Sequence, residues 1–509
     1  MIRFLFAWSL LSSLLSPAFG QETPDLVDAQ LGGADRAEPP TLELDLAQAL
    51  ELAMRNNLGL RLAEVDSEVA SYDQLGSWGE FEWNFNVQGI YTDSQREVTS
   101  SFLSGGATIE SQNENLIVDL SKPLTSGGTF GINFNTDRQT TNAAIADAER
   151  LYSDLLAVTL TQPLRRRAWK EYATSIQRER ELGWRQQVEI QRQTRQDLVF
   201  QVSTAYWDLV AAVEQLKVSI SGKALAEELL RRRQRELEAG VGTEVEVLES
   251  RADVATRVEA VLQAQNTASE RGDELKRILY GNTDESLWSL ELVPSTPLPS
   301  SPDAQPPTWT EALLTAIELR SELRQLRLAA DIARLAHQRT LSERLAGIDL
   351  SLTASSGAVD ENGSSALSDT ANWEFPTWTV GLTYDMPIGN RVADYAERSA
   401  RSGVRRALLE YDSAEVDVVA NVRKAVRDVL FRAQAVRAAQ TSLALSTRQL
   451  EAEKARNEQG LSTNYQVLEV QQSYVEALSG ERSARAEYAK ALVALEQSQG
   501  LLGEAGNQL

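Results

Sequence analysis

Cysteine is absent from this chain of 509 residues, and histidine occurs once, at His337. The first absence excludes a disulfide framework, a thiolate metal site, a cysteine nucleophile and a lipid-modified N-terminal cysteine. The sequence also contains no glycine-rich phosphate loop and no nucleophile elbow, so it offers almost none of the groups and motifs on which enzyme catalysis commonly depends. We therefore expect a protein that is not an enzyme and that holds no cofactor or metal, with His337 on the surface of a helix.

Long apolar segments are also scarce. Residues 4–15 are apolar and lead to the small residues Ala18 and Gly20, which is typical of a secretory signal peptide over residues 1–20. The alternative is a plain N-terminal anchor, but a spanning helix needs roughly 20 apolar residues, more than this run contains. No later apolar run approaches that length, which argues against transmembrane helices. Transmembrane β-strands are still possible, because their sequence pattern is an alternation of apolar and polar residues. An exported chain without disulfides suits a bacterial envelope.

Positive charge is in deficit, because 50 Lys and Arg residues face 73 Asp and Glu residues and give a net charge of -23. This balance argues against nucleic acid, whose binding rests on neutralising phosphates with Lys and Arg. Proline is sparse too, and six of the 14 prolines fall within residues 292–307. Such a segment cannot continue a helix and predicts a stiff, extended linker.

The chain contains an internal repeat. Residues 238–249 and 458–469 match at six of twelve positions, and each copy stands between a very long and a shorter helical pattern. This arrangement predicts two equivalent helical hairpins. The sequence then divides into a first structural repeat over residues 21–291, the linker over residues 292–307, a second repeat over residues 308–503 and a C-terminal tail over residues 504–509.

Alternating apolar and polar residues predict β-strands in both halves. In the second half, one strand is expected over residues 377–386 and its partner around residues 348–354, with a long polar loop, residues 357–372, between them. In the first half four strands are expected, near residues 81–88, 116–120, 130–134 and 156–160. Because both counts are even, the chain leaves each β region on the side where it entered, and all helices can lie on that side.

Long helical patterns without proline follow the strands, over residues 164–239 and 388–459. Apolar residues such as Leu198, Val202 and Leu209 recur at steps of three and four, which predicts a coiled-coil seam. At about 1.5 Å per residue, roughly 70 to 75 residues make a rod of about 110 Å. Shorter helices, over residues 243–279 and 463–500, are expected to return antiparallel after the repeated turn.

Six amphipathic strands are too few to close a membrane barrel within one chain, which takes at least about eight. An open sheet edge in lipid would leave backbone groups unsatisfied at several kcal/mol each, so several chains must share one barrel. The sequence therefore predicts an α+β membrane protein, in which tandem-repeat protomers form a shared transmembrane β-barrel and a long α-helical coiled-coil barrel.

The chain resembles the TolC-like outer-membrane efflux proteins, or outer membrane factors, over nearly all of its length after the signal peptide. The resemblance is carried by the Gly-Val and Gly-Leu turns followed by Val-Leu-Glu, and by strands that end at Pro163 and Pro387 and lead into the long helices. It implies a homotrimer in the lipid of the bacterial outer membrane, with its helical part in the periplasm. It also implies that a periplasmic adaptor, or membrane fusion protein, and an inner-membrane pump or ABC transporter dock at the far end.

The function that this resemblance implies is a channel of a tripartite efflux or type I secretion system, and the sequence does not separate small-molecule efflux from polypeptide secretion. Family protomers usually have two strands in each half, so the four in the first half imply either a wider barrel or a hairpin outside the membrane. The alternative from another class is a periplasmic coiled-coil scaffold without a pore, which would not need the alternating strands.

The repeated turns supply candidate site residues. Glycine suits the positive φ at which helices end, and Thr243 with Glu246 and Thr463 with Gln466 form capping-box patterns. The resemblance implies that these turns are periplasmic tips that meet the adaptor through Gly240, Val241, Thr243, Gly460, Leu461 and Thr463. The candidates for the periplasmic entrance are Glu246, Glu249, Gln466 and Glu469. Of these, Glu246 and Gln466 are expected mainly as caps, while Glu249 and Glu469 are either an acidic ring or a solvated face.

Aromatic residues near the strands are expected at the membrane interface, with ordinary sheet packing as the alternative. They are Trp83, Phe85, Trp373, Phe375, Trp378 and Tyr384. Two arginine runs, residues 165–167 and 231–233, are expected on solvated helix faces, the first also as an interfacial anchor.

Overall fold

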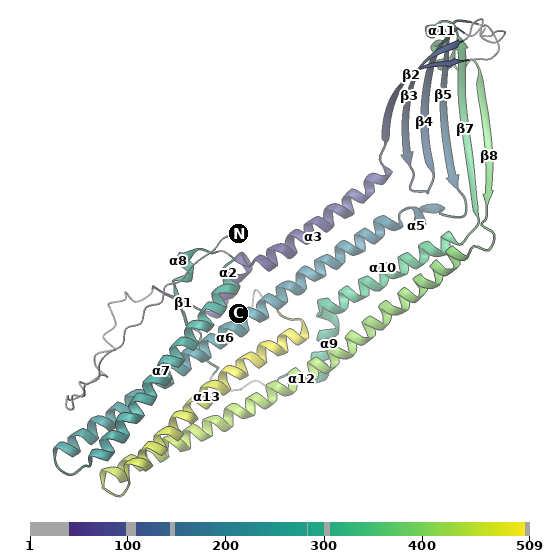
Figure 1. The fold of residues 1–509 in the computed structure, drawn as a ribbon. Helices are drawn as coiled ribbons and strands as arrows, with labels where there is room; N and C mark the ends of the chain where they lie inside the picture. Colours follow the sequence, from purple (N-terminus) through teal and green to yellow (C-terminus); the bar gives the residue numbers. More distant parts are fainter. Residues whose placement is uncertain (1–39, 98–107, 143–147, 282, 300–305, 504–509) are drawn as a thin grey trace, which may run out of the picture.

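The computed structural model describes residues 40–97, 108–142, 148–281, 283–299 and 306–503. It is an elongated molecule with one β-sheet at one end and long helices that run away from it to two hairpin turns (Figure 1). The chain thus combines helices and sheet as predicted. The signal peptide expected over residues 1–20, the tail over residues 504–509 and part of the proline-rich linker lie outside the described residues.

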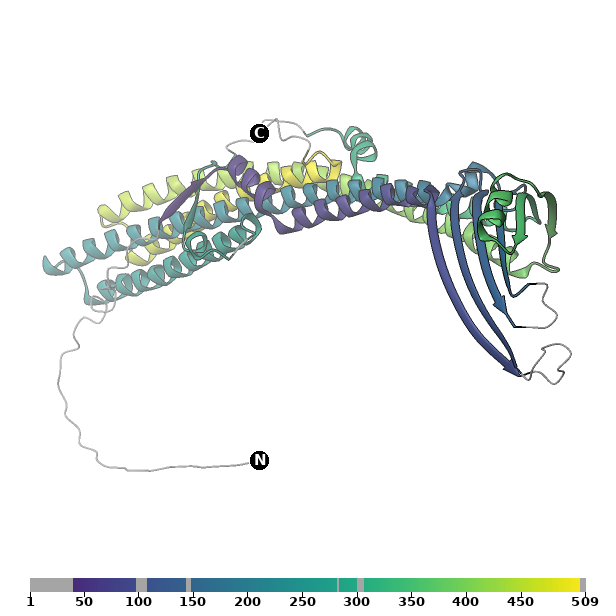
Figure 2. The ribbon, with the colours of Figure 1, turned by 90° about the horizontal axis from the view of Figure 1, so that it is seen from above.

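The sheet has six antiparallel strands in the order β2-β3-β4-β5-β7-β8. They are β2 (Asn84–Glu97), β3 (Thr108–Pro123), β4 (Thr129–Thr141), β5 (Arg150–Pro163), β7 (Gly347–Asp360) and β8 (Pro376–Asp385). The pairing of β5 with β7, in register at Leu160 and Leu352, joins the two halves of the chain. Figure 2 shows that the sheet is bowed. Within the described residues, β2 and β8 each pair on one side only, so the sheet has two open edges.

The strand positions follow the alternation in the sequence, with two corrections. The first strand begins at Asn84, because residues Ser77–Phe81 form a 3-10 helix and Trp83 precedes the strand. The second correction concerns residues 357–372, which are not a simple loop: β7 extends to Asp360, and helix α11 (Gly363–Ala371) follows. Asn362 caps this helix. Its residues Ala366 and Thr370 are buried on the face that packs against the sheet.

Four helices lead away from the sheet: α3 (Leu58–Gly76), α6 (Ser175–Glu238), α10 (Ser321–Glu343) and α12 (Arg391–Glu458). The two long helices begin later than predicted. A short helix, α5 (Trp169–Ala173), stands ahead of α6, since Arg167 and Trp169 have φ values of 59° and 70°. Gly389 and Asn390, with φ values of 91° and 31°, likewise delay the start of α12. Left-handed backbone of this kind cannot continue a right-handed helix.

The return helices are α7 (Glu244–Leu279) and α13 (Asn464–Gln499). They pack along α6 and α12, and the seam residues Leu198, Val202 and Leu209 are buried as their periodicity predicts. Each return helix ends beside the start of a helix that leads to the sheet: α7 beside α3, and α13 beside α10. The side-chain amide of Asn57, ahead of α3, donates to the carbonyl of Ile278 in α7 at 3.2 Å, and Gly500 lies against the backbone of Arg320 at the start of α10.

A small group of elements surrounds the middle of the rod: β1 (Thr41–Leu44), α2 (Leu46–Asn56), α8 (Glu285–Trp288), β6 (Glu291–Pro294) and α9 (Trp309–Leu319). Strand β1 pairs in parallel with β6. The linker expected over residues 292–307 is therefore wrong at its start, where Leu292 to Pro294 belong to a strand and Leu292 is buried. The hydroxyl of Tyr206 on α6 donates to the carbonyl of Leu44 at 3.0 Å. Two apolar cores meet the long helices here, one under α2 and β1 and the other under α9.

Candidate functional site

The two hairpin turns at the far end of the helices have the same backbone geometry. Gly240 and Gly460 have φ values of 79° and 73°, and a Cβ atom at either position would meet no other atom within 4 Å. The amide of Val241 donates to the carbonyl of Glu236 at 3.0 Å, and that of Leu461 to the carbonyl of Arg456 at 2.9 Å. These are the contacts that end a helix at a left-handed glycine. Backbone geometry therefore favours glycine at both positions.

The first residues after each turn form reciprocal caps. Thr243 accepts from the amide of Glu246, whose carboxylate accepts from the amide of Thr243 at 3.0 Å. Thr463 and Gln466 repeat the arrangement at the start of α13. Glu246 and Gln466 thus have a local role at these helix ends, as their spacing predicts.

Apolar side chains stand in solvent around both turns. Val241 is 80% exposed and Leu461 65% exposed. Three more that the sequence did not single out are exposed nearby, namely Val245, Leu248 and Tyr465. Exposed apolar patches of this kind mark contacts with other proteins.

The acidic candidates Glu249 and Glu469 are not equivalent. Glu249 accepts a hydrogen bond of 3.3 Å from the side-chain amide of Asn464 in the other hairpin. Within the described residues Glu469 makes no side-chain hydrogen bond or ion pair, and it is exposed. Glu249 therefore has a partner in the other hairpin, whereas the side chain of Glu469 stays in solvent.

A buried arginine ties the two hairpins together. Arg233, at the end of α6, is 7% exposed and donates to the side-chain oxygens of Asn464 at 3.0 Å and Asn457 at 3.1 Å, both in the second hairpin. Its third partner is Glu236, at 2.6 Å. The arginine run 231–233 was expected on a solvated face, which is wrong for Arg233. The sequence of this helix could not show that Arg233 is buried, because its burial depends on the neighbouring hairpin.

The second hairpin carries the opposite charges at the equivalent positions. Glu453 and Arg456, 220 residues after Arg233 and Glu236, form an ion pair of 3.4 Å. Glu453 is nearly buried and accepts a hydrogen bond from Ser462 in its own turn. The charged pair of the first hairpin thus reaches across to its neighbour through Arg233, while the equivalent pair of the second hairpin contacts its own turn.

The aromatic candidates lie near the two ends of the strands. Trp83, Phe85 and Tyr384 are at the helix side, because β2 begins and β8 ends there, while Trp373, Phe375 and Trp378 are at the far side. Trp373 stacks on Trp378 with ring centroids 6.4 Å apart. On β8 the alternate residues from Trp378 to Tyr384 are more than 60% exposed and cover about 20 Å at about 3.3 Å per residue. An exposed apolar face of this height, bounded by aromatic residues, fits a lipid layer.

The sequence led us to expect His337 on the surface of a helix, but the structure places it in a cluster of charged side chains. Its Nε2 lies 3.0 Å from Oε1 of Glu397, whose side chain is almost buried, and Arg344 and Arg401 also approach that carboxylate. The hydrogen bond with His337 and the two arginines, opposed by burial, hold the pKa of Glu397 below its ordinary value. This cluster fixes α10 to α12.

No group of His, Cys, Asp and Glu among the described residues is arranged to hold a metal ion. In the same part of the chain, every helix is too short or too polar to cross a membrane.

Residues 313–501 match the family model described as "Outer membrane efflux protein". The chain is 25% identical over 328 residues to the alkaline protease secretion protein AprF of Pseudomonas aeruginosa, in a match that covers 62% of this chain. This match spans 64% of AprF, just under two thirds of its length. The chain is also 23% identical over 444 residues to the outer membrane protein TolC of Vibrio cholerae, covering 84% of this chain and 94% of TolC. The solved outer-membrane channel OprN has the same fold, with a TM-score of 0.67 and 15% identity over 89% of each chain.

Proposed function

We infer the function of this chain from its membership of the TolC-like outer membrane efflux proteins, which the family model and the two relatives establish. The resemblance read from the sequence is confirmed. The chain is a protein of the bacterial outer membrane, and its helical part lies in the periplasm. The solved structure that shares its fold, OprN, is an outer-membrane channel.

We propose that three copies close one transmembrane β-barrel and one helical tunnel. The support for this proposal is the open sheet: β2 and β8 lie at its two edges, and each has one row of backbone groups that pairs with no strand of the described chain. β2 runs away from the helices and β8 runs toward them, so β8 of one copy and β2 of the next can pair antiparallel. Three six-stranded sheets then give 18 strands, enough to surround an aqueous pore.

The two interpretations of the additional hairpin, β2 with β3, predict different neighbours for β8. β3 pairs with β4 over thirteen residues from Ser111 to Pro123, so the hairpin continues the sheet. This observation favours the wider barrel, since barrel diameter grows roughly in proportion to strand number. If the hairpin instead stood outside the membrane, β4 would become the edge that meets β8 of the next copy.

Engineered cysteines can distinguish these arrangements, because the natural chain contains none. Cysteine at Gln88 in β2 is combined with cysteine at each of residues 379–382 in β8, and cross-linked trimers are sought on denaturing gels. A matched series places the first cysteine at Asn133 in β4. Cross-linking from Gln88 supports the 18-stranded barrel, cross-linking from Asn133 alone supports the external hairpin, and the absence of both contradicts the shared barrel.

We further propose that the hairpin turns are the periplasmic tips at which an adaptor and, through it, an inner-membrane pump are engaged. The exposed Val241 and Leu461 support this proposal, with Gly240, Thr243, Gly460 and Thr463 holding the turns in shape. At the entrance we retain Glu469 as the candidate for an acidic ring, since it is exposed without a partner among the described residues. Glu246 and Gln466 have local hydrogen bonds, and Glu249 has one from the other hairpin.

The proposed conduit carries substrates of a tripartite efflux or type I secretion system. The match to a protein named for alkaline protease secretion makes polypeptide secretion the first activity to test. The purified protein is extracted from membranes in detergent, and its conductance is measured in planar bilayers. A protein that is freely soluble without detergent and does not conduct would instead support the periplasmic scaffold.

A further inference from the structure

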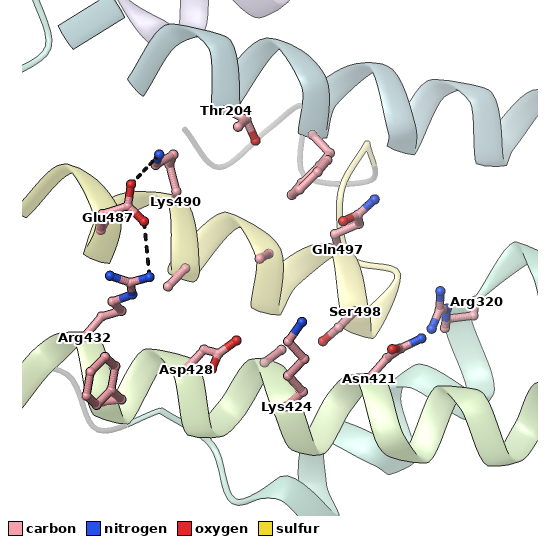
Figure 3. A pocket seen from close by; sticks show the side chains of 15 residues that line it. Thr204, Arg320, Asn421, Lys424, Asp428, Arg432, Glu487, Lys490, Gln497 and Ser498 are labelled. Atoms are coloured by element: carbon pink, nitrogen blue, oxygen red, sulfur yellow. Dashed lines mark ion pairs between the residues drawn. The ribbon is translucent and has the colours of Figure 1, made fainter. Parts of the chain in front are cut away.

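A hollow of about 600 Å³ lies between α6, α12 and α13, where α13 ends and α10 begins (Figure 3). Phe200 and Thr204 of α6 line it on one side, and Lys424 and Asp428 of α12 on the other. Arg320, the residue between α9 and α10, lies at its end. Its volume is within the range of pockets that hold small molecules.

Three hydrogen-bond donors at this hollow have no acceptor among the described residues: two are buried, and the third belongs to the exposed side chain of Lys424. Nη1 of Arg320 and Oγ1 of Thr204 are buried atoms that make no hydrogen bond. Among the described residues Lys424 makes no ion pair or hydrogen bond, and Figure 3 shows its amino group within the hollow. Buried polar groups are normally paired, because leaving one unpaired costs free energy. An occupant that brings acceptor oxygens would satisfy all three.

The other basic residues of the hollow are already paired. Lys490 lies 2.6 Å from Glu487 and 2.8 Å from Asp208, and Arg432 lies 3.4 Å from Glu487. Partial burial would lower the pKa of Lys490, but the hydrogen bonds and charges of Asp208 and Glu487 outweigh it and raise the pKa. Nη2 of Arg320 is 3.4 Å from Glu322. The unused donors of the hollow are therefore those of Thr204 on one wall, Lys424 on the opposite wall and Arg320 at the end.

The lining also has an apolar part, beside the polar side chains of Asn421, Gln497 and Ser498. Phe200 and Phe431 face the hollow from α6 and α12, and three alanines of α12 and α13 line it between the charged groups. Phe431 is 62% exposed, which is unusual for a large aromatic side chain. An occupant that covers these rings needs an apolar body beside its acceptor oxygens.

We propose that this hollow is a binding site for a small organic anion, whose charged group bonds to Arg320 and Lys424 and whose other acceptor oxygen reaches Thr204, while an aromatic or aliphatic body packs on Phe200 and Phe431. All the residues belong to one chain, so the site does not rest on the proposed conduit. Binding and conductance are measured separately, and either result can stand without the other.

Equilibrium dialysis of the full chain in detergent, with salicylate as the probe, tests the site. Salicylamide has nearly the same shape without the charge and serves as the matched ligand. We expect saturable binding of salicylate that weakens as salt is raised, and salicylamide binding at the level of detergent alone. Equal binding of the two ligands, or salicylate uptake that does not saturate, would overturn the proposal.

Variants on α12 assign the binding to this hollow. Lys424→Met should weaken salicylate binding roughly three- to tenfold, because an exposed charge pair is partly screened. Asp428→Asn should strengthen it, since it removes a negative charge beside the ligand. Lys454→Met, on the same helix about 45 Å away, is the control and should leave binding unchanged. The proposal fails if Lys424→Met and Lys454→Met bind salicylate alike, or if Asp428→Asn weakens binding.

Discussion

Replacing Arg233 with methionine is predicted to loosen the contact between the two hairpin tips, which keep the hydrogen bond of Asn464 with Glu249 and the ion pair of Arg232 with Glu458. The guanidinium of Arg233 is buried and donates to Asn464 and Asn457 of the second hairpin and to Glu236 of its own helix. Methionine keeps much of the apolar stem and its packing. The substitution therefore removes mainly the polar contacts.

The expected cost follows from what each acceptor loses. Glu236 keeps the guanidinium of Arg232, at 3.0 Å, so its loss is small. The oxygens of Asn464 and Asn457 lose a charged donor at a buried position. At about 1.5–3 kcal/mol for a hydrogen bond to a charged group, and allowing for water that enters at the tip, we expect about 2–4 kcal/mol in the free energy of local opening. This change corresponds to roughly 30- to 1,000-fold in the opening equilibrium.

Amide hydrogen exchange followed by mass spectrometry measures this opening. Peptides that cover the first turns of α13 should exchange at least about 30-fold faster in Arg233→Met, while peptides of the sheet keep their rates. The matched control is Arg235→Met, because Arg235 is exposed and its Nε donates only to the backbone carbonyl of Arg231, at 3.3 Å. Arg233→Lys keeps the charge without the fork of donors and should fall between the two.

Two outcomes would refute this reasoning. Exchange at the start of α13 within about threefold of the Arg235→Met control would mean that the buried contacts contribute little net stability. Faster exchange throughout the helices and the sheet would mean that Arg233 supports the whole fold and not the tip.

Three further predictions test other parts of the molecule. Gly460→Val should cost about 1–2 kcal/mol through backbone strain at φ 73° and impair coupling to the adaptor while trimers survive, and Gly460→Asn should be tolerated better; loss of the trimer on gels would favour a purely structural role. Leu382→Arg on the apolar face of β8 should cost about 2–4 kcal/mol in the membrane and reduce outer-membrane assembly, whereas Thr383→Arg on the other face should assemble; equal assembly of both variants contradicts the assignment of faces. Because the pKa of Glu397 is held below its ordinary value, the stability that this carboxylate contributes is present at neutral pH and is lost as pH falls through the folded-state pKa. Glu397→Gln should therefore reduce the acid sensitivity of thermal unfolding, followed by circular dichroism. An unchanged pH profile contradicts the role of the cluster.

The parts of the fold that the sequence predicts are those whose signal lies within one element. The alternation along β8 and the steps of three and four along α6 depend on residues that are neighbours in sequence, and both elements are found where the pattern places them. The capping boxes at Thr243 and Thr463 are equally local. Helix starts are harder to predict, because the left-handed backbone at Arg167 and Trp169 is not marked by residue type.

The features that the sequence did not predict depend on partners far along the chain. The parallel pair of β1 and β6 has four residues in each strand, too few to show a period, and lies at opposite ends of the first repeat. Arg233 reads as one more charge in a basic run, and its burial follows only from the position of Asn457 and Asn464 in the second hairpin. Glu249 gains its partner in the same way.

The two hairpins share a backbone but not a chemistry, and this difference bears on the proposed trimer. Arg233 and Glu236 in the first hairpin correspond to Glu453 and Arg456 in the second, so each ion pair has the reverse polarity of the other. Within one chain the first hairpin contacts the second through Arg233. In a ring of three chains, the second hairpin would next meet the first hairpin of a neighbouring copy on a face that does not offer Arg233, because that side chain is already buried within its own chain. The six hairpins would then be held by two kinds of contact that alternate around the ring, and Arg233→Met would weaken only the contacts within each chain. Local exchange that rises at the start of α13 without any loss of trimer is the result that this arrangement requires.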